Sequence, residues 1–318
     1  MADVTPPPPQ TLTIVMYHYV RDLARSRYPR IKGRTTEEFR KQLAHLAERH
    51  TAVTRARVLA AFRGQEPLPA NAALLTFDDG YLDHYTNVFP LLHERGIEGW
   101  FFPPARAIRE GRVLDVNKLH FVLATVSDVA PMVDAIRDAV NEHRAGENLK
   151  PFDAYWSELA VASRFDPAEV IFVKRMLQAV LPESLRARVT DDLFRRYVTA
   201  DESAFAAELY VSPDQLRTMI RCGMYVGPHG DTHAWMDRLT ESEQRAEVDA
   251  SLRFMAEIGA PSEEWVMCYP YGAHNQSLER VLAERGCTLG LTTRVAVATT
   301  SDHPLGLPRL DTNDFPAT

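Results

Sequence analysis

The sequence predicts an α/β fold, a distorted or incomplete (β/α) barrel that carries a helical insertion. Three observations lead to this prediction. Strand-like and helical segments alternate near both ends of the chain, which is typical of helices around a parallel sheet. Between them, residues 105–210 carry helical patterns and few strand signals. Polar clusters follow directly after several predicted strands, where the active sites of such barrels lie.

The N-terminal part of the chain predicts two successive strand–helix units. Residues 11–20, TLTIVMYHYV, are rich in β-branched and aromatic side chains and predict the first strand. Residues 35–49 begin with a threonine cap and acidic side chains and then show helical spacing. Residues 71–80 form a second strand, whose continuous apolar run is typical of a parallel strand buried on both faces. A helix over residues 87–96 and a strand over residues 97–102 follow.

The central part of the chain interrupts this alternation, which resumes after residue 211. Further strands are expected within residues 224–233, 264–272, 287–293 and 304–310, with helices between them. We therefore expect three parts. They are a disordered proline-rich lead over residues 1–10, a barrel over residues 11–104 and 211–318, and a helical insertion or cap over residues 105–210.

Composition limits the classes of partner. The 318 residues include 36 Lys and Arg and 43 Asp and Glu, a formal net charge of −7, so no basic excess is available for binding nucleic acid. Three widely spaced cysteines, Cys222, Cys268 and Cys287, predict free thiols in a reducing compartment. The N-terminus lacks a secretory pattern and no apolar run approaches about 18 residues, so we expect a cytoplasmic protein without a membrane span. The oligomeric state is left open.

Two adjacent aspartates end the second predicted strand in the stretch LLTFDDGY, residues 74–81. On their own, Asp78 and Asp79 before a glycine are compatible with a solvated turn. The stretch GPHGDTHAWM follows a later strand and places His229 and His233 four residues apart, which on its own is also compatible with two solvated histidines. A further histidine, His18, lies near the end of the first strand.

A metal site would account for these clusters together. Two imidazoles and one carboxylate from another strand end form a facial set that suits zinc or another divalent metal with open positions. Neighbouring side chains in an extended segment point in opposite directions, so Asp78 and Asp79 can have different tasks. One can bind the metal, and the other can accept a proton from the attacking water.

The motifs TFDDG, HGDTH and YPYG, in this order and after successive strands, resemble the polysaccharide deacetylase family. Members of this family are metal-dependent de-N-acetylases and de-O-acetylases of carbohydrates with a distorted (β/α)7 barrel. The resemblance covers about residues 11–104 and 211–311 and leaves the insertion unexplained. It is closest to a branch with YPYG as the third motif.

By position, the resemblance implies that Asp78 is the catalytic base and that Asp79, His229 and His233 bind the metal. The expected metal is zinc, with cobalt, nickel or iron as alternatives. The backbone N–H of Tyr271 is expected to stabilise the oxyanion, a role that needs no particular side chain.

The sequence departs from the family pattern in two places. The third motif normally supplies an arginine that orients the base, but residues 268–272 read CYPYG. We expect Arg309, in LPRLDTND, to replace it by pairing with Asp78. The usual C-terminal Leu-x-His motif is also not evident, so His18 is expected to be the general acid, as in a branch with MYHYV-like first strands. Simple packing of His18 at a barrel rim is the alternative.

The resulting prediction is a metal-dependent hydrolase of carbon–nitrogen bonds that removes an acetyl group, most plausibly N-acetyl, from a carbohydrate. Nucleotide- or lipid-linked sugars of surface polysaccharide (O-antigen, lipopolysaccharide) biosynthesis, or an oligosaccharide, are the expected substrates. The alternatives are a non-carbohydrate amidohydrolase on the same fold and a non-catalytic carbohydrate-binding descendant. Expected substrate contacts are Tyr81, Trp235, Tyr269, His274 and Asn275.

Overall fold

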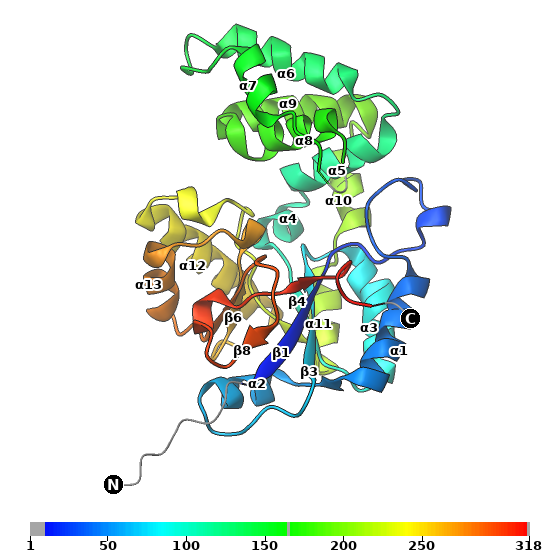
Figure 1. The fold of residues 1–318 in the computed structure, drawn as a ribbon, viewed down its shortest axis with the longest axis vertical. Helices are drawn as coiled ribbons and strands as arrows, with labels where there is room; N and C mark the ends of the chain where they lie inside the picture. The colour runs from blue at the N-terminus through cyan, green and yellow to red at the C-terminus, as the bar shows by residue number, and fades with distance from the viewer. Residues whose placement is uncertain (1–9, 164–165, 317–318) are drawn as a thin grey trace. The chain divides into compact units, whose positions relative to one another are not determined.

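The computed structural model describes residues 10–163 and 166–316. Apart from Gln10, the predicted disordered lead lies outside the described residues. The chain divides into two compact units. The sheet unit contains residues up to Asp22, Gly33–Arg112 and the chain from Ala206 onward, and the helical unit contains Leu23–Lys32 and Val113–Phe205 (Figure 1).

The main sheet of the sheet unit has seven strands, most of them parallel. Its order is β5-β4-β3-β1-β8, with β2 paired to β3 and β9 paired to β1. The central pair β1–β3 is parallel and in register from Leu12–Ala72 to Tyr17–Phe77. The strands are β1 (Thr11–Tyr17), β2 (Thr51–Ala52), β3 (Ala72–Asp78), β4 (Gly99–Phe102), β5 (Tyr225–Val226), β8 (Ala298–Thr299) and β9 (Leu310–Asp311).

Two further strands, β6 (Val266–Cys268) and β7 (Leu289–Leu291), pair in parallel as a separate two-stranded sheet. One core cluster contains apolar residues from strands of both sheets, including Ile14, Leu74 and Trp100. The described residues show no strand ladder between β5 and β6. The observed architecture is therefore α/β with a mainly parallel sheet, and closure of the predicted barrel is not seen as continuous pairing.

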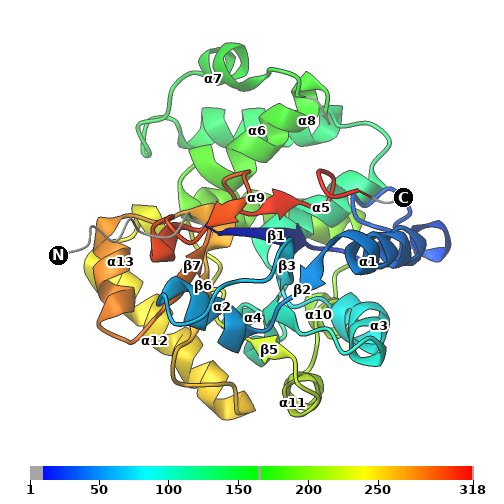
Figure 2. The same cartoon turned by 60° about the horizontal axis from the view of Figure 1, so that its bottom comes forward.

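Helices flank the strands of the sheet unit, with α1 and α3 to one side and α12 and α13 to the other (Figure 2). The predicted helix at 35–49 is confirmed as α1, and its start is fixed by a capping box between Thr35 and Glu38. The predicted helix at 87–96 instead begins as a π-helical turn at His84. The helices are α1 (Thr36–Arg49), α2 (Arg55–Phe62), α3 (Phe89–Glu94), α4 (Ala105–Glu110), α11 (Pro213–Arg221), α12 (Glu241–Ile258) and α13 (Gln276–Ala283).

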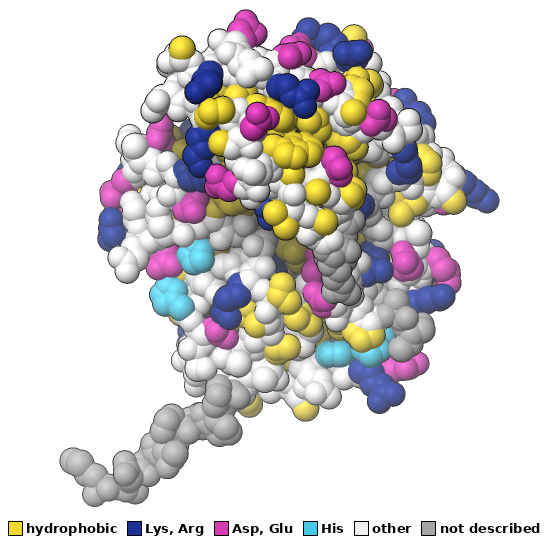
Figure 3. Space-filling model, turned by 45° about the horizontal axis from the view of Figure 1, so that its top comes forward, with side chains coloured by type: hydrophobic (Ala, Val, Ile, Leu, Met, Phe, Trp, Pro, Cys, Tyr) yellow, Lys and Arg dark blue, Asp and Glu magenta, His cyan; other side chains and the backbone are white. Residues whose placement is uncertain are grey.

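The helical unit confirms the expectation that the central part of the chain is helical. The helical pattern of residues 105–210 is broken at Leu181, because Pro182 cannot continue the preceding helix and caps the next one. Hydrophobic side chains gather on one face of this unit among basic and acidic ones (Figure 3). Its helices are α5 (Asp115–Thr125), α6 (Ala130–His143), α7 (Phe152–Leu159), α8 (Ala168–Arg175) and α9 (Glu183–Tyr197); α10 (Glu202–Leu209) leads into the sheet unit.

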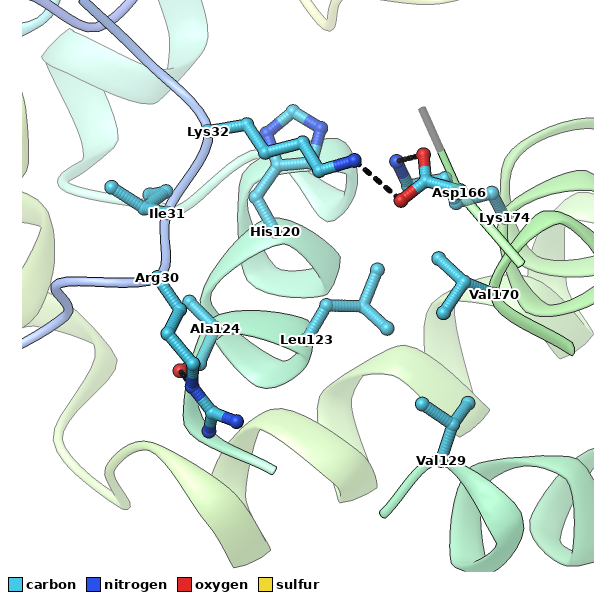
Figure 4. A pocket seen from close by; sticks show the side chains of 10 residues that line it. All are labelled: Arg30, Ile31, Lys32, His120, Leu123, Ala124, Val129, Asp166, Val170 and Lys174. Atoms are coloured by element: carbon cyan, nitrogen blue, oxygen red, sulfur yellow. Dashed lines mark hydrogen bonds and ion pairs between the residues drawn. The ribbon is translucent and has the colours of Figure 1, made fainter. Parts of the chain in front are cut away.

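The segment 23–32 packs into the helical unit beside a cavity of about 150 Å³ (Figure 4). Arg30 donates hydrogen bonds to the carbonyls of Ala124 and Thr125, which end α5. Asp166 accepts hydrogen bonds from both Lys32 and Lys174. These contacts attach segment 23–32 to the helical unit. Only five residues separate this segment from the end of β1. None of the described helices combines the length and the apolar character that crossing a bilayer requires.

Candidate active site

The two adjacent aspartates lie where β3 ends. Asp78 is the last residue of the strand, and Asp79 adopts a positive φ of 70°, followed by Gly80 at 63°. This reversal turns the two neighbouring carboxylates toward different partners. A non-glycine residue held in the left-handed region costs roughly 1–3 kcal/mol, and such residues cluster at functional sites. Among the described residues, six non-glycines have a positive φ, and Asp79, His233 and Tyr271 are three of them.

Asp79 lies opposite the two predicted metal-binding histidines. Its Oδ1 atom is 3.4 Å from Nε2 of His229 and 3.3 Å from Nε2 of His233. Nδ1 of His229 donates a hydrogen bond to the carbonyl of Cys268 at 2.8 Å, which directs the other ring nitrogen, Nε2, toward Asp79. Two ring nitrogens and one carboxylate oxygen, all possible metal-ligand atoms, therefore converge in a buried space. A divalent cation matches this donor set of two imidazoles and one carboxylate.

A second group of possible ligands lies beside the first and contains Asp78, His229 and Cys268. It is less suited to a metal for two reasons. Both carboxylate oxygens of Asp78 already accept hydrogen bonds from Arg309. Burial raises the pKa of the Cys268 thiol, which disfavours the thiolate that a metal would need. The set of Asp79, His229 and His233 is therefore the metal site that the geometry favours.

Tyr81 holds the predicted metal ligand Asp79 in place. Its hydroxyl donates a hydrogen bond to Oδ2 of Asp79 at 2.5 Å, and its ring stacks on Tyr19 with centroids 4.0 Å apart. Burial, followed by the nearby Asp79 charge, raises the pKa of Tyr81 well above its usual value, so the hydroxyl stays a donor. The side chain is 0% exposed. In this structure Tyr81 holds Asp79, and its predicted contact with the substrate stays a prediction.

Arg309 forms a bidentate ion pair with Asp78 inside the sheet unit. Its Nη1 and Nη2 atoms lie 2.8 and 2.7 Å from the two carboxylate oxygens, and Nε donates to the carbonyl of Thr292 at 2.9 Å. Burial alone would raise the pKa of Asp78, but the guanidinium outweighs it and lowers the pKa to about 2. Asp78 is therefore ionised at neutral pH. The pairing is the one that the missing motif arginine led us to expect.

His18 follows directly after β1 and is partly exposed. Its carbonyl accepts a hydrogen bond from Nε2 of His84 at 2.8 Å. Burial lowers the pKa of His84 to about 4, so this donor is a neutral ring. Burial raises the pKa of Asp78 and Asp79, and their hydrogen-bond and ion-pair partners lower it. His18 also lowers the pKa of both carboxyls, less strongly than these partners do, so it lies beside the site. Its role as general acid stays a prediction.

The YPYG motif forms a wall of the candidate active site next to His233. Tyr271 has a positive φ of 58° within the short turn Pro270–Gly272. Its ring stacks on Trp235 with centroids 4.2 Å apart and planes 3° apart, and it meets the ring of His233 edge-on at 4.7 Å. The partly exposed Trp235 thus lies one ring away from a metal ligand.

The other three predicted substrate contacts have different surroundings. Tyr269 is 0% exposed, donates its hydroxyl to the carbonyl of Leu305, and stacks under the ring of His274. Asn275 caps α13 by accepting from the N–H of Leu278, so its side chain has a structural task. Of the three, His274 lines an open groove.

Two carboxylates, Glu247 and Asp231, hold the histidine loop. Glu247 accepts hydrogen bonds from the backbone N–H groups of Asp231 and Thr232, which lie between the two ligand histidines. Asp231 pairs with Arg106 and Arg109 of α4. Glu247 had no recognisable signal, because it lies in the middle of a regular amphipathic helix, α12.

Comparison with known proteins agrees with this geometry. A sequence model of the polysaccharide deacetylase family matches residues 187–290. A poly-β-1,6-N-acetyl-D-glucosamine N-deacetylase of Escherichia coli K12 is 40% identical over 88 residues, which is 27% of this chain and 13% of that protein. The chain thus spans only a small part of the length of this curated relative.

Solved structures of deacetylases share the fold over nearly the whole chain. Streptococcus pyogenes deacetylase PplD, solved with acetate, has a TM-score of 0.60 at 15% identity and covers 95% of this chain and 92% of its own. IcaB from Ammonifex degensii has a TM-score of 0.57 at 19% identity, with 97% and 95% covered. The motifs, the family match and the fold agree with the resemblance: residues 187–290 match the polysaccharide deacetylase model, and the fold is that of solved deacetylases.

Proposed function

We propose that this protein is a metal-dependent N-deacetylase of a glycan built from N-acetylhexosamine units. One observation carries the proposal. The facing set of Asp79, His229 and His233 lies beside an ionised carboxylate, Asp78, that Arg309 holds in place. A binding protein has no need of this second carboxylate, whereas hydrolysis needs a proton acceptor next to the ligands.

The chain's own residues then have distinct tasks. Asp79, His229 and His233 hold the metal, which when bound polarises the acetyl carbonyl and makes the attacking water more acidic. That help matters because Arg309 makes Asp78 a weak base, with a pKa of about 2, while fixing its position. Asp78 accepts the proton of the attacking water. The backbone N–H of Tyr271 donates to the carbonyl oxygen as negative charge develops there.

His18 protonates the leaving nitrogen in this proposal. The water oxygen forms a bond to the acetyl carbon, the carbon–nitrogen bond breaks, and the nitrogen leaves as an amine after receiving the His18 proton. The products are acetate and an amino sugar. Zinc is the metal we expect, with cobalt, nickel or iron as alternatives that the same ligands accept.

For the substrate, the similarity to a poly-β-1,6-N-acetyl-D-glucosamine N-deacetylase favours an N-acetylglucosamine polymer. This replaces the O-antigen intermediate, linked to nucleotide or lipid, as the first candidate. The exposed part of the Trp235–Tyr271 pair offers a flat apolar surface beside the metal ligands, which suits a sugar ring. We also propose that the two sheets belong to one incomplete barrel, since they share a core cluster.

Acetate release from β-1,6-linked N-acetylglucosamine oligomers by the zinc-loaded protein tests the proposal. We expect turnover that a chelator abolishes and that added metal restores. Turnover on simple N-acetylated amines but not on oligomers would support the rival amidohydrolase. Oligomer binding without any acetate release, in wild type and Asp78→Asn alike, would support a non-catalytic carbohydrate-binding protein.

A further inference from the structure

A polar groove of about 730 Å³ begins at Gly272, directly after Tyr271. Thr293 lines this groove and donates its hydroxyl to the carbonyl of Tyr271 at 3.2 Å. A Cβ atom at Gly272 would lie only 2.4 Å from the Thr293 hydroxyl, so the two segments pack without space between them. The groove is therefore built onto the same turn that forms the wall of the candidate active site.

Two imidazoles face each other across a glycine in this groove. A Cβ atom added at Gly306 would lie 3.8 Å from Nε2 of His274 and 3.8 Å from Nδ1 of His303. A larger side chain at this position would fill the space between the rings. Stacking on the buried Tyr269 fixes the ring of His274, with centroids 4.8 Å apart. Gly306 therefore leaves open space between the two rings, and the ring of His274 is held in a fixed position beside that space.

One carboxylate in the groove, that of Glu279, has imidazoles as its ion-pair partners. Oε1 of Glu279 lies 3.6 Å from His274 and 4.0 Å from His303, and within the described part of the chain no lysine or arginine pairs with it. The other two charges nearby, Arg294 and Asp302, pair with each other at 3.1 Å. Leaving the imidazoles aside, the formal charges of Glu279, Arg294 and Asp302 sum to one negative charge, which lies on a carboxylate in the first turn of α13.

We propose that this groove binds a cationic amino sugar, the already deacetylated neighbour of the unit whose acetyl group is removed. The inference rests on the proposed function. A protonated amine matches the Glu279 carboxylate through a charge-assisted hydrogen bond, whereas a neutral N-acetyl group would cover the carboxylate without neutralising it. His274, His303 and Thr293 supply partners for sugar hydroxyls. The product of one turnover then favours the next turnover on the same chain.

Two matched tetrasaccharides test this proposal. Both are β-1,6-linked N-acetylglucosamine tetramers, one fully acetylated and one with a single free amine at an internal unit. We expect kcat/KM for acetate release to be about tenfold higher for the amine-bearing tetramer with wild-type protein. In Glu279→Gln this ratio falls to about one. The matched control is Glu284→Gln, which removes the same charge just beyond α13 at a carboxylate that pairs with Arg245 outside the groove.

The outcomes separate this inference from the proposed function. A wild-type ratio near one, or a ratio that Glu279→Gln leaves unchanged, overturns the inference and leaves the deacetylase standing. No acetate release from either tetramer by metal-loaded protein overturns the deacetylase. In that case an NMR titration with glucosamine tetramer decides the groove: weaker binding in Glu279→Gln but not in Glu284→Gln supports it, and equal binding in all three proteins overturns it.

Discussion

Each unit of the molecule buries a cluster of charges, and the two clusters are built differently. In the helical unit, Lys118 is 2% exposed at its side chain, and its Nζ atom lies 2.5 Å from Asp191, 3.1 Å from Glu202 and 3.8 Å from Asp115. These three carboxylates keep 27–45% of their side-chain surface exposed. All four residues lie on regular helices, and none has a positive φ.

In the sheet unit, the charged groups at the strand ends are almost fully buried. Asp78, Asp79 and Arg309 are 1–3% exposed, and Asp79 has a left-handed backbone. Three possible metal ligands converge at Asp79 and the two histidines, whereas the Lys118 ammonium lies among carboxylates that pair with it. The comparison teaches that burial of charge does not by itself mark a site. The mark is a buried set of possible metal ligands that converge on one point, held by a strained backbone.

The largest expected effect comes from removing the features that only the sheet-unit cluster has. His229→Ala/His233→Ala should lose the bound metal and all measurable turnover. Asp78→Asn should keep the metal but lose roughly 10²–10⁴ in kcat, because it lacks the proton acceptor. Metal content by mass spectrometry and acetate release distinguish the two variants. Wild-type protein that stays metal-free after reconstitution would overturn the metal site.

The ion pair between Asp78 and Arg309 provides a second test. Arg309→Met leaves a buried carboxylate without its partner and should lower the free energy of unfolding by about 3 kcal/mol. Asp78→Asn/Arg309→Met removes both charges and should recover part of this loss. Denaturant unfolding of the two single variants and the double variant measures the coupling. Additive losses would show that the two charges do not stabilise each other and that each side chain contributes only its own packing to the free energy of unfolding.

The pH dependence of stability tests the same ion pair between Asp78 and Arg309. The folded pKa of Asp78, about 2, lies below its ordinary value of 3.8, so its contribution to stability is present above about pH 4. That contribution, on the order of 2 kcal/mol, should be lost as the pH falls from about 4 toward 2. Unfolding of Asp78→Asn should depend less on pH over this interval. Parallel curves for wild type and variant would contradict the assignment.

The smallest effect is expected in the helical unit. Lys118→Met should cost only about 1 kcal/mol of unfolding free energy, because the three carboxylates are partly exposed and water can solvate them. Turnover should stay within about twofold of wild type, since the cluster holds helices together and no role in the chemistry is assigned to it. A loss of activity as large as that of Asp78→Asn would erase the distinction between the clusters.

Much of the fold could be predicted because its signals are local. The continuous apolar run of β3 and the capping boxes at Thr35, Ser212 and Thr240 are written in a few consecutive residues. The two-residue strands β2 and β8 could not be predicted, because so short a segment has no measurable periodicity. The break at Pro182 was missed because hydrophobic spacing continues across it.

For the site, the motifs indicated the residues that meet the metal but not those that hold them. The backbone contacts of Glu247 and the hydrogen bond from Tyr81 to Asp79 depend on how distant segments pack. Tyr81 was expected to contact the substrate because an aromatic side chain directly after the DDG motif can stack on a sugar ring. Its complete burial follows from the neighbouring rings of Tyr19 and Tyr210, which no local pattern reveals.

The ion pair between Asp78 and Arg309 joins residues 231 positions apart. Arg309 directly precedes β9, which aligns beside β1 through the pairing of Leu310 with Val15. On the ribosome, the strand that carries both aspartates is therefore made long before the arginine that orients one of them. A chain released early can form its first strands, but it leaves the Asp78 carboxylate without its counterion. The proposed base is oriented only after residue 309 has been made, so a chain cut anywhere before Arg309 has the aspartate without its orienting partner.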